Sequence, residues 1–151
     1  QKRHGYRKKI FNIIKFRTMF DADRDLHSTK QTKINDSRIT KFGKFIRKTN
    51  IDELPNLLNV LFGQMSIVGP RPHALKTKLN NNFYIHNLEN YNYRFLTKPG
   101  ITSLSHVRSS AGQLSTMSKL KARINFDLIY VKKCSVIFDM RIILMTLKLY
   151  I

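Results

Sequence analysis

The chain has 151 residues, 42% of them hydrophobic and 11% aromatic, which is the size and composition of one folded domain and excludes a disordered segment. Lysine and arginine number 28 against 9 aspartate and glutamate, so the formal net charge of +19 indicates an anionic partner: nucleic acid, anionic lipid or a phosphorylated substrate. The single cysteine, Cys134, excludes an internal disulfide, and the five scattered histidines do not have the spacing of a zinc site.

The first part of the chain predicts a strand, a loop and a helix. Ile10–Met19 is rich in β-branched and aromatic residues and predicts a strand, and the polar run Phe20–Asn35 predicts a mobile loop. Ile39–Lys48 has the spacing of a short helix whose apolar side chains share one face: Phe42, Phe45 and Ile46. Basic residues surround that face, which is typical of a helix at a membrane interface and equally of a helix that packs on a core.

The next segments predict a second helix and then a turn. Asp52–Phe62 reads as a helix with Asp52 as its N-cap, which places Pro55 in the first turn, and Gly63 ends it. Ser66–Pro72 is rich in glycine and proline and predicts a shaped turn.

The remainder of the chain predicts further helices. The expected segments are a helix over Ala74–Leu96, a break at Lys98–Gly100, a short extended piece at Ile101–Val107, and closing helices at Met117–Val131 and Val136–Leu149. No apolar stretch is long enough to span a bilayer, because charged residues interrupt the best one, Ser135–Ile151. We therefore expect a single mixed α/β domain, dominated by helices with a small sheet, that does not span a membrane by itself but could lie on one.

Acidic residues are scarce, so the adjacent pair Asp52–Glu53 is informative. Two neighbouring carboxylates can divide the work of catalysis, with one attacking or binding a metal ion while the other handles protons or tunes its neighbour. The same pair also fits a structural role, because Asn50 and Glu53 have the spacing of a capping box and acids stabilise a helix N-terminus by ~0.3–1 kcal/mol. Taken alone, the pair fits the structural role better.

Basic residues on both sides of the pair change that balance. Lys15 and Arg17 alternate on the predicted strand and so point to the same side. Arg71 lies in a Gly-Pro-Arg-Pro turn, where two prolines restrict the backbone before any ligand arrives. A guanidinium held in this way can bind a phosphate through two hydrogen bonds. With Arg38 and Arg47 added, the composition is typical of a phosphoryl-transfer site that uses a divalent metal ion.

Long motifs around these residues resemble the bacterial sugar transferases, the monotopic polyprenyl-phosphate phosphoglycosyl transferases. The matching segments are Gln1–Gly5, KFRTM at Lys15–Met19 and the uninterrupted block Asp36–Pro72, which contains DELP and GPRP. Weaker matches are KPGIT at Lys98–Thr102 and the tail that begins at Asn125. The resemblance covers most of the chain.

The resemblance implies the activity, the partners and the location. A nucleotide diphospho-sugar, such as a UDP-sugar, would donate its sugar-1-phosphate to polyprenyl (undecaprenyl) phosphate, the first membrane step of exopolysaccharide, capsule or lipopolysaccharide assembly. The implied nucleophile is Asp52, assisted by Glu53, with Mg²⁺ held at Asp52 to neutralise the diphosphate. The implied phosphate ligands are Lys15, Arg17, Arg38, Arg47 and Arg71.

The resemblance also implies the extent of the domain and its location in the cell. Members of the family carry a hydrophobic re-entrant helix just before the Gln-x-Arg segment, and this chain begins at Gln1 without an initiator Met. We therefore expect residues 1–151 to be one catalytic domain that lacks this membrane helix, associated with the cytoplasmic face of the bacterial inner membrane.

Two other functions are compatible with parts of the sequence. The charge alone fits a nucleic-acid-binding protein, but the chain has no helix-turn-helix, zinc-finger or RNP-like motif, so we expect no nucleic acid as partner. A catalytically inactive membrane-surface relative is the second alternative. The intact Asp52–Glu53 pair and Arg71 argue against it.

Overall fold

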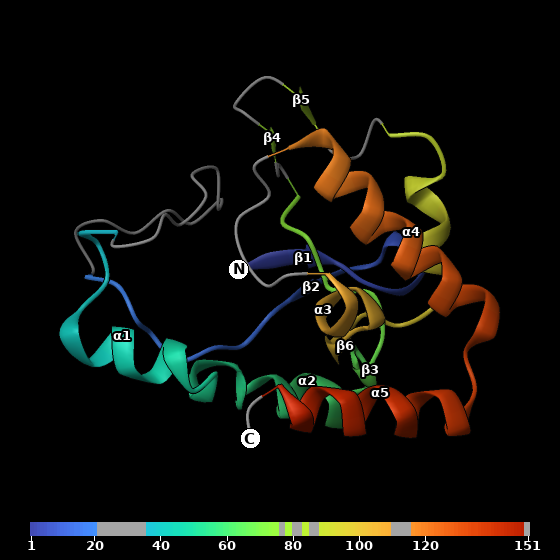
Figure 1. The fold of residues 1–151 in the computed structure, drawn as a ribbon. Coiled ribbons are helices and arrows are strands. Elements are labelled where there is room, and N and C mark those ends of the chain that lie inside the picture. Colours follow the sequence, from blue (N-terminus) through green and yellow to red (C-terminus); the bar gives the residue numbers. More distant parts are fainter. Residues whose placement is uncertain (21–35, 76–77, 80–82, 85–87, 110–115, 150–151) are drawn as a thin grey trace.

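The computed structural model describes residues 1–20, 36–75, 78–79, 83–84, 88–109 and 116–149 (Figure 1), so most of the predicted loop Phe20–Asn35 lies outside the described residues. The helices are α1 (Lys41–Lys48), α2 (Asn56–Leu61), α3 (Leu104–Arg108), α4 (Met117–Lys133) and α5 (Val136–Lys148). Short 3₁₀ segments are η1 (Tyr6–Lys8), η3 (Ile51–Glu53) and η5 (Tyr91–Leu96). The strands are β1 (Lys2–His4), β2 (Ile10–Asn12), β3 (Ser66–Val68), β4 (Lys78–Leu79), β5 (Phe83–Tyr84) and β6 (Gly100–Thr102). The described fold is rich in helix with little sheet, as expected.

The described strands form three two-stranded sheets, one of which, β3–β6, brings distant motifs together. β1 and β2 make an antiparallel hairpin in which Arg3 lies opposite Phe11. β3 and β6 are parallel, and Ser66 and Val68 pair with Gly100 and Thr102. Gly69 and Gly100 permit this pairing, because a Cβ on either would collide with the backbone of the other segment. The turn that carries Arg71 therefore lies beside the KPGIT segment.

The predicted strand Ile10–Met19 is only partly correct, because the ladder ends at Asn12. Beyond it the chain stays extended but bonds to other elements. The side chain of Asn59 in α2 replaces a partner strand: its Oδ1 accepts from Ile14 N at 3.0 Å and its Nδ2 donates to Asn12 O at 2.9 Å. Phe16 N then donates to the Asp52 carbonyl at 3.1 Å, which joins the segment to η3.

The prediction of one helix over Asp52–Phe62 is wrong at its start. The chain forms η3, and α2 begins only after Pro55. Pro55 has no N–H to continue a helical ladder from Ile51, so Leu54 N bonds Ile51 O in a tighter turn. Asp52 is therefore not a helix N-cap. Asn50 has a left-handed backbone (φ 55°) and makes no capping hydrogen bond, which removes the capping box as an explanation for the acidic pair.

Three predictions for the middle of the chain are also corrected. Ser66–Pro72 begins with β3 and is not only a turn, and Ile101–Val107 contains the start of α3, which Ser103 caps by accepting from His106 N. Ala74–Leu96 is not a helix, because its described residues form β4, β5 and η5. Its asparagine-rich composition explains this, since asparagine side chains compete with the helix for backbone hydrogen bonds.

The helix predictions at Ile39–Lys48, Met117–Val131 and Val136–Leu149 are confirmed within a few residues, and Gly63 ends α2 with a φ of 70°. The α4 helix packs on η5 and α3, and α5 packs on α3, β3 and β6. Buried residues form three clusters around these contacts: Tyr91, Phe95, Leu120 and Ile124; Val68, Leu104, Tyr130 and Ile142; and Phe11, Ile13 and Met65.

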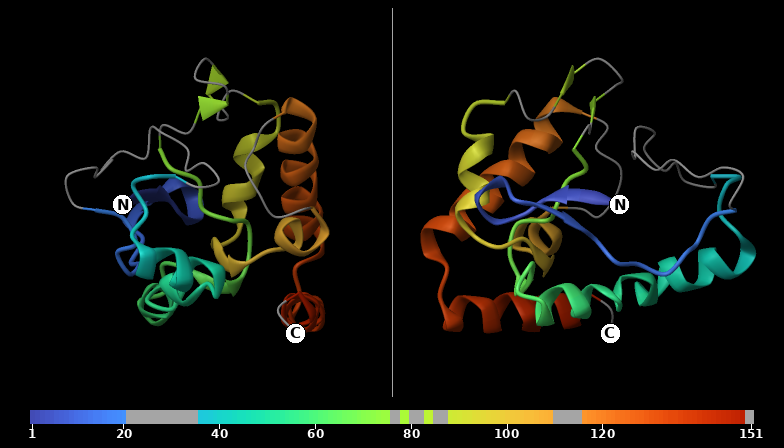
Figure 2. Two further views of the ribbon diagram at one scale, coloured as in Figure 1. Left: turned by 60° about the vertical axis from the view of Figure 1, so that its left-hand side comes forward. Right: turned by 180° about the vertical axis from the view of Figure 1, so that it is seen from behind.

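The helices α1, α2 and α5 lie along one side of the molecule in all three views (Figures 1 and 2). They carry a large share of the exposed apolar side chains: Phe42, Phe45, Leu57, Leu58, Leu61, Val136, Ile137, Met140, Leu144 and Leu147. The sequence had suggested that Ile46 shares a face with Phe42 and Phe45. In the structure Ile46 is buried, whereas the two phenylalanines are exposed. Among the described residues, no helix combines the length and apolar composition needed to cross a bilayer.

Candidate active site

Glu53 lies between two cations that come from distant parts of the chain. Lys15 Nζ donates to Glu53 Oε1 at 2.6 Å, and Arg71 donates to the same oxygen at 2.7 Å. The Glu53 side chain is 14% exposed, against 29% for Lys15 and 46% for Arg71. The extended segment after β2, η3 and the turn after β3 therefore converge at this carboxylate.

The electrostatics of Glu53 follow from these contacts. Burial alone would raise its pKa, but Arg71 and Lys15 outweigh burial and hold the pKa at about 2. For Lys15, burial and the nearby Arg71 lower the pKa, and Glu53 opposes that shift. Glu53 is thus an ionised acid at neutral pH that keeps two cations in place.

Asp52 occupies a different environment from its neighbour. Its side chain is half-buried, its carboxylate accepts a hydrogen bond from its own backbone N–H, and among the described residues no other residue donates to it or forms an ion pair with it. Burial raises the pKa of Asp52, while the charges of Lys15 and Arg47 oppose that shift. A half-buried carboxylate without an ion-pair partner is more basic and less solvated than an ion-paired one, which suits a nucleophile or a metal ligand.

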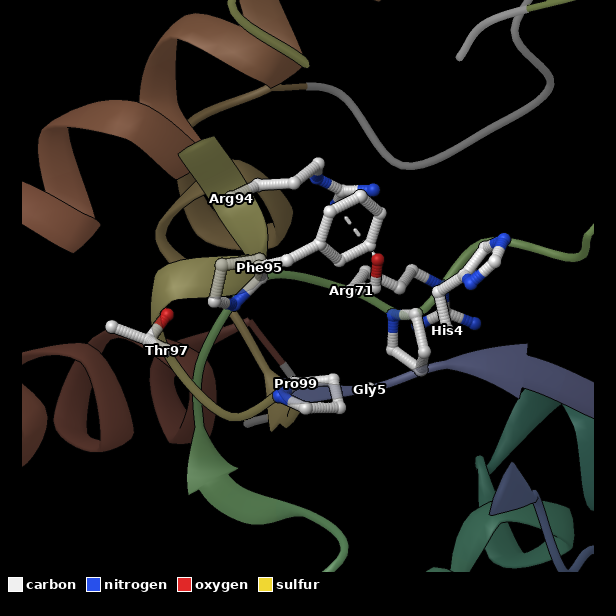
Figure 3. A pocket seen from close by; sticks show the side chains of 9 residues that line it. His4, Gly5, Arg71, Arg94, Phe95, Thr97 and Pro99 are labelled. Atoms are coloured by element: carbon white, nitrogen blue, oxygen red, sulfur yellow. Dashed lines mark hydrogen bonds between the residues drawn. The ribbon is translucent and has the colours of Figure 1, made fainter. Parts of the chain in front are cut away.

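Arg71 is held in place through its backbone. Arg94 donates to the Arg71 carbonyl at 2.7 Å and to Asp127 Oδ2 at 2.6 Å, and the first of these bonds is drawn in Figure 3. The Arg94 and Asp127 side chains are 1% and 3% exposed. Burial lowers the pKa of the Arg94 guanidinium, but the interactions with Asp127 and Tyr91 outweigh burial and raise this pKa above its ordinary value. The predicted rigidity of the proline-flanked turn is therefore reinforced by a buried ion pair.

A cavity of about 80 Å³ opens beside Glu53. Its polar wall consists of Arg3, Lys15, Glu53, Asn56 and Arg71. A second cavity on the other side of Arg71, shown in Figure 3, has only about 10 Å³, which is room for roughly one water molecule. The larger cavity is therefore the one that can accept part of a substrate.

The remaining predicted cations lie apart from this cavity. Arg47 donates to Thr18 Oγ1 at 2.7 Å and acts electrostatically on Asp52, so it lies near Asp52 and not in the cavity wall. Arg38 forms a two-point ion pair with Asp36, at 2.8 and 2.6 Å, and precedes α1, whose length of ~12 Å separates it from η3. Arg17 is exposed and does not line the cavity.

Several residues of the site were not anticipated from the sequence: Arg3, Asn56, Asn59, Arg94 and Asp127. Asp127 did carry a signal, because it is one of few acids in the chain and lies in the apolar run Phe126–Val131. Arg3 also carried a signal, because it is the arginine of the Gln-x-Arg segment, but nothing distinguished its role from that of the other basic residues near the start of the chain.

The residues around Asp52 fit a magnesium ion that is held largely by its substrate. Among the described residues there is no group of three or more His, Cys, Asp or Glu side chains that could enclose a metal. Mg²⁺ commonly uses one or two carboxylates and completes its shell with water and substrate phosphates. The carboxylate of Asp52, which no other described residue binds, fits this mode, whereas Glu53 is already paired with two cations.

Comparison with known sequences identifies the family of the chain. The family model described as "Bacterial sugar transferase" matches residues 1–151. The chain is 41% identical over 148 residues to an undecaprenyl-phosphate glucose phosphotransferase of Komagataeibacter xylinus, a match that covers 98% of this chain and 28% of that relative.

Two further relatives give the same family. The chain is 43% identical over 146 residues to a UDP-glucose:undecaprenyl-phosphate glucose-1-phosphate transferase of Klebsiella pneumoniae, covering 97% of this chain and 30% of the relative. It is 43% identical over 143 residues to the exopolysaccharide production protein PSS of Rhizobium leguminosarum bv. phaseoli, covering 95% of this chain and 72% of that protein. The chain spans less than a third of the first two relatives' length. With the family model matched from end to end, the chain belongs to the bacterial sugar transferases.

Proposed function

We propose that residues 1–151 form a catalytic domain that transfers a sugar-1-phosphate from a nucleotide diphospho-sugar, of the UDP-sugar class, to undecaprenyl phosphate. The observation that carries this proposal is the contrast within one acidic pair. Glu53 binds Lys15 and Arg71, while no other described residue forms a hydrogen bond or ion pair with the adjacent Asp52 carboxylate. The names of the relatives, which act on UDP-glucose and undecaprenyl phosphate, support the choice of substrates.

The reaction has two displacements at one phosphorus atom. A carboxylate oxygen of Asp52 attacks the phosphorus that bears the sugar, and the bond to the bridging oxygen breaks, so the nucleoside monophosphate leaves with that electron pair. This step produces a sugar acyl-phosphate on Asp52. An oxygen of the polyprenyl phosphate then attacks the same phosphorus and releases the Asp52 carboxylate.

The basic residues stabilise charge on the phosphoryl oxygens in both steps. Lys15 and Arg71 are held at Glu53 before substrate arrives, so less reorganisation is needed when the anion binds. Arg47 lies near Asp52 and acts on it electrostatically. We propose Arg38 and Arg17 as outer ligands of the nucleotide. Asp52 would hold a Mg²⁺ ion together with the substrate diphosphate, and that ion would supply further charge neutralisation.

We further propose that the domain is monotopic and rests on the cytoplasmic face of the inner membrane through the side formed by α1, α2 and α5. Phe42, Leu61 and Val136 on these helices are 69%, 79% and 79% exposed, which is unfavourable in water but not at a lipid interface. The net charge of +19 adds electrostatic attraction to anionic lipid, worth ~1 kcal/mol for each basic residue near the surface.

Vesicle binding tests this orientation. The protein should bind vesicles that contain anionic lipid, and added salt should weaken the binding. Changing Phe42 and Phe45 to serine should reduce it at constant charge, whereas Phe16→Ser, an exposed phenylalanine outside these helices, should not. Indifference to anionic vesicles at low salt would contradict the surface proposal.

Release of nucleotide before acceptor addition tests the catalytic proposal. The full-length protein with Mg²⁺ and UDP-glucose should release UMP in an amount stoichiometric with enzyme when no polyprenyl phosphate is present. Asp52→Asn keeps the side-chain size but removes the nucleophile, so it should lower turnover by roughly 10⁴-fold or more and abolish the burst.

Retention of the fold by Asp52→Asn, seen in its unfolding temperature, is the control. Near-normal turnover by this variant would replace the covalent mechanism with direct transfer and leave the carboxylates as metal ligands. A wild-type protein that binds membranes but releases no nucleotide from any sugar nucleotide would identify an inactive relative.

A further inference from the structure

The cavity beside Glu53 has one basic wall residue whose charge the mechanism above does not use. Arg3 lies in β1 and lines the cavity, with Lys15 and Arg71 as the other two basic residues of the wall. Its guanidinium donates to Gln1 Oε1 at 2.7 Å and to Lys2 O at 3.2 Å, and both acceptors are uncharged. No acidic side chain among the described residues pairs with Arg3.

The cavity therefore holds more positive charge than it neutralises. Three cations face a single carboxylate, Glu53, whose Oε1 already bonds two of them. Burial, and then the charge of Arg71, lower the pKa of Arg3 to about 10, which means that its surroundings disfavour its charge. A bound anion would relieve both the burial penalty and the repulsion between Arg3 and Arg71.

A second, uncharged group in the wall also lacks a partner. Asn56 is 1% exposed and its Oδ1 accepts no hydrogen bond within the described part of the chain. Leaving such a buried acceptor unpaired costs ~1–3 kcal/mol, which a ligand hydroxyl would offset. The volume of about 80 Å³ suits a group of several heavy atoms, since one water needs roughly 10–15 Å³. This is the scale of a phosphate group and not of a whole sugar nucleotide.

From these observations we propose that Arg3 and Arg71 bind one phosphate group of the donor inside this cavity, so that Arg3 is a substrate ligand. The identity of the ligand as a sugar nucleotide rests on the proposed function, whereas the anion site rests on the cavity itself. Both arginines present planar guanidinium groups that match phosphate oxygens. Asn56 accepts a hydrogen bond from a hydroxyl next to that phosphate.

The local contacts of Arg3 make it suitable for mutation. Among the described residues its side chain donates hydrogen bonds to Gln1 and Lys2, within two residues, so its loss removes no hydrogen bond between distant elements. The matched control is Lys2, the preceding residue of β1, which is exposed and does not line the cavity. Lys2→Gln and Arg3→Gln remove the same charge one residue apart.

Calorimetric titration of the full-length protein with pyrophosphate at fixed ionic strength tests the site directly. We expect Arg3→Gln to weaken pyrophosphate binding by about tenfold, the scale of one charge-assisted hydrogen bond, Arg3→Lys to recover part of it, and Lys2→Gln to change it less than twofold. Equal binding by wild type and Arg3→Gln would overturn the proposal. So would equal losses in Arg3→Gln and Lys2→Gln, because only total charge would then matter.

Turnover separates this inference from the proposed function. If the site is correct, Arg3→Gln should raise KM for UDP-glucose while retaining the UMP burst at saturating donor, since Asp52 is intact. Wild-type turnover with normal KM in Arg3→Gln would contradict the role of Arg3 and leave the function standing. Arg3-dependent pyrophosphate binding by a protein that turns over no sugar nucleotide would contradict the function and support the anion site.

Discussion

Two ion-pair clusters meet at Arg71 and differ in what they can do. The backbone carbonyl of Arg71 bonds to Arg94, whose partner Asp127 is almost completely buried. The side chain of Arg71 bonds to Glu53 at the edge of an open cavity. The first cluster is closed to water and to substrate, and the second is open to both. One residue thus connects a structural ion pair with a functional one.

The burial of each cluster explains the division of roles. A buried pair is costly to form but still more costly to break, so Arg94 and Asp127 hold the turn in one conformation. A partly exposed pair is weak, so Lys15 and Arg71 can exchange Glu53 for a phosphate at little cost. The site thus combines a fixed backbone at Arg71 with two cationic side chains, Lys15 and Arg71, that can change partners.

Breaking the buried pair should have the largest effect on stability. Asp127→Asn leaves the Arg94 charge buried without a counter-charge, so we expect the free energy of unfolding to fall by about 3–5 kcal/mol. Urea denaturation of the wild type and the variant measures this difference. Asp36→Asn is the control, because it disrupts the more exposed Asp36–Arg38 pair and should cost less than ~1 kcal/mol. Similar losses of unfolding free energy in Asp127→Asn and Asp36→Asn would show that burial does not distinguish the two ion pairs.

A substitution in the open cluster of Lys15, Glu53 and Arg71 should change the activity much more than the stability. Arg71→Lys keeps the charge and an ion pair with Glu53 but loses the second donor to phosphate. We expect kcat/KM for UDP-glucose to fall ten- to hundredfold, equivalent to about 1.5–3 kcal/mol, with unfolding within ~1 kcal/mol of wild type. Arg7→Lys, at an exposed arginine over the Tyr6 ring, is the matched control and should leave both quantities unchanged. Wild-type kcat/KM in Arg71→Lys would show that the planar guanidinium is not required.

The sequence was sufficient for part of this arrangement because the signals were local. The scarcity of acids drew attention to Asp52 and Glu53, and the two prolines around Arg71 indicated a fixed turn. The helices α4 and α5 were predictable because apolar periodicity persists over many residues and Thr116 and Ser135 cap their starts.

The rest depended on contacts between distant positions. Arg94 bonds to residues 23 and 33 positions away, and no local pattern distinguishes it from other arginines. The end of β2 is determined by the Asn59 side chain, 47 positions from Asn12. Apolar periodicity also failed between Ala74 and Leu96, because short strands and 3₁₀ turns have too few residues to establish a period.

The smallest expected effect is the pH dependence of the open cluster. The folded pKa of Glu53 is about 2 and the ordinary value is 4.5, so the unfolded chain takes up a proton at Glu53 before the folded chain does. The stabilisation by this group is therefore complete above about pH 4.5 and is lost as the pH falls towards 2.

Glu53→Gln should be less stable than wild type at pH 7 by ~1 kcal/mol, since both cationic partners are partly exposed. The difference should shrink steadily below pH 4.5 in denaturant unfolding measured across pH. A difference that stays constant between pH 7 and pH 3 would mean that Glu53 stabilises the fold through neutral hydrogen bonds and not through its charge.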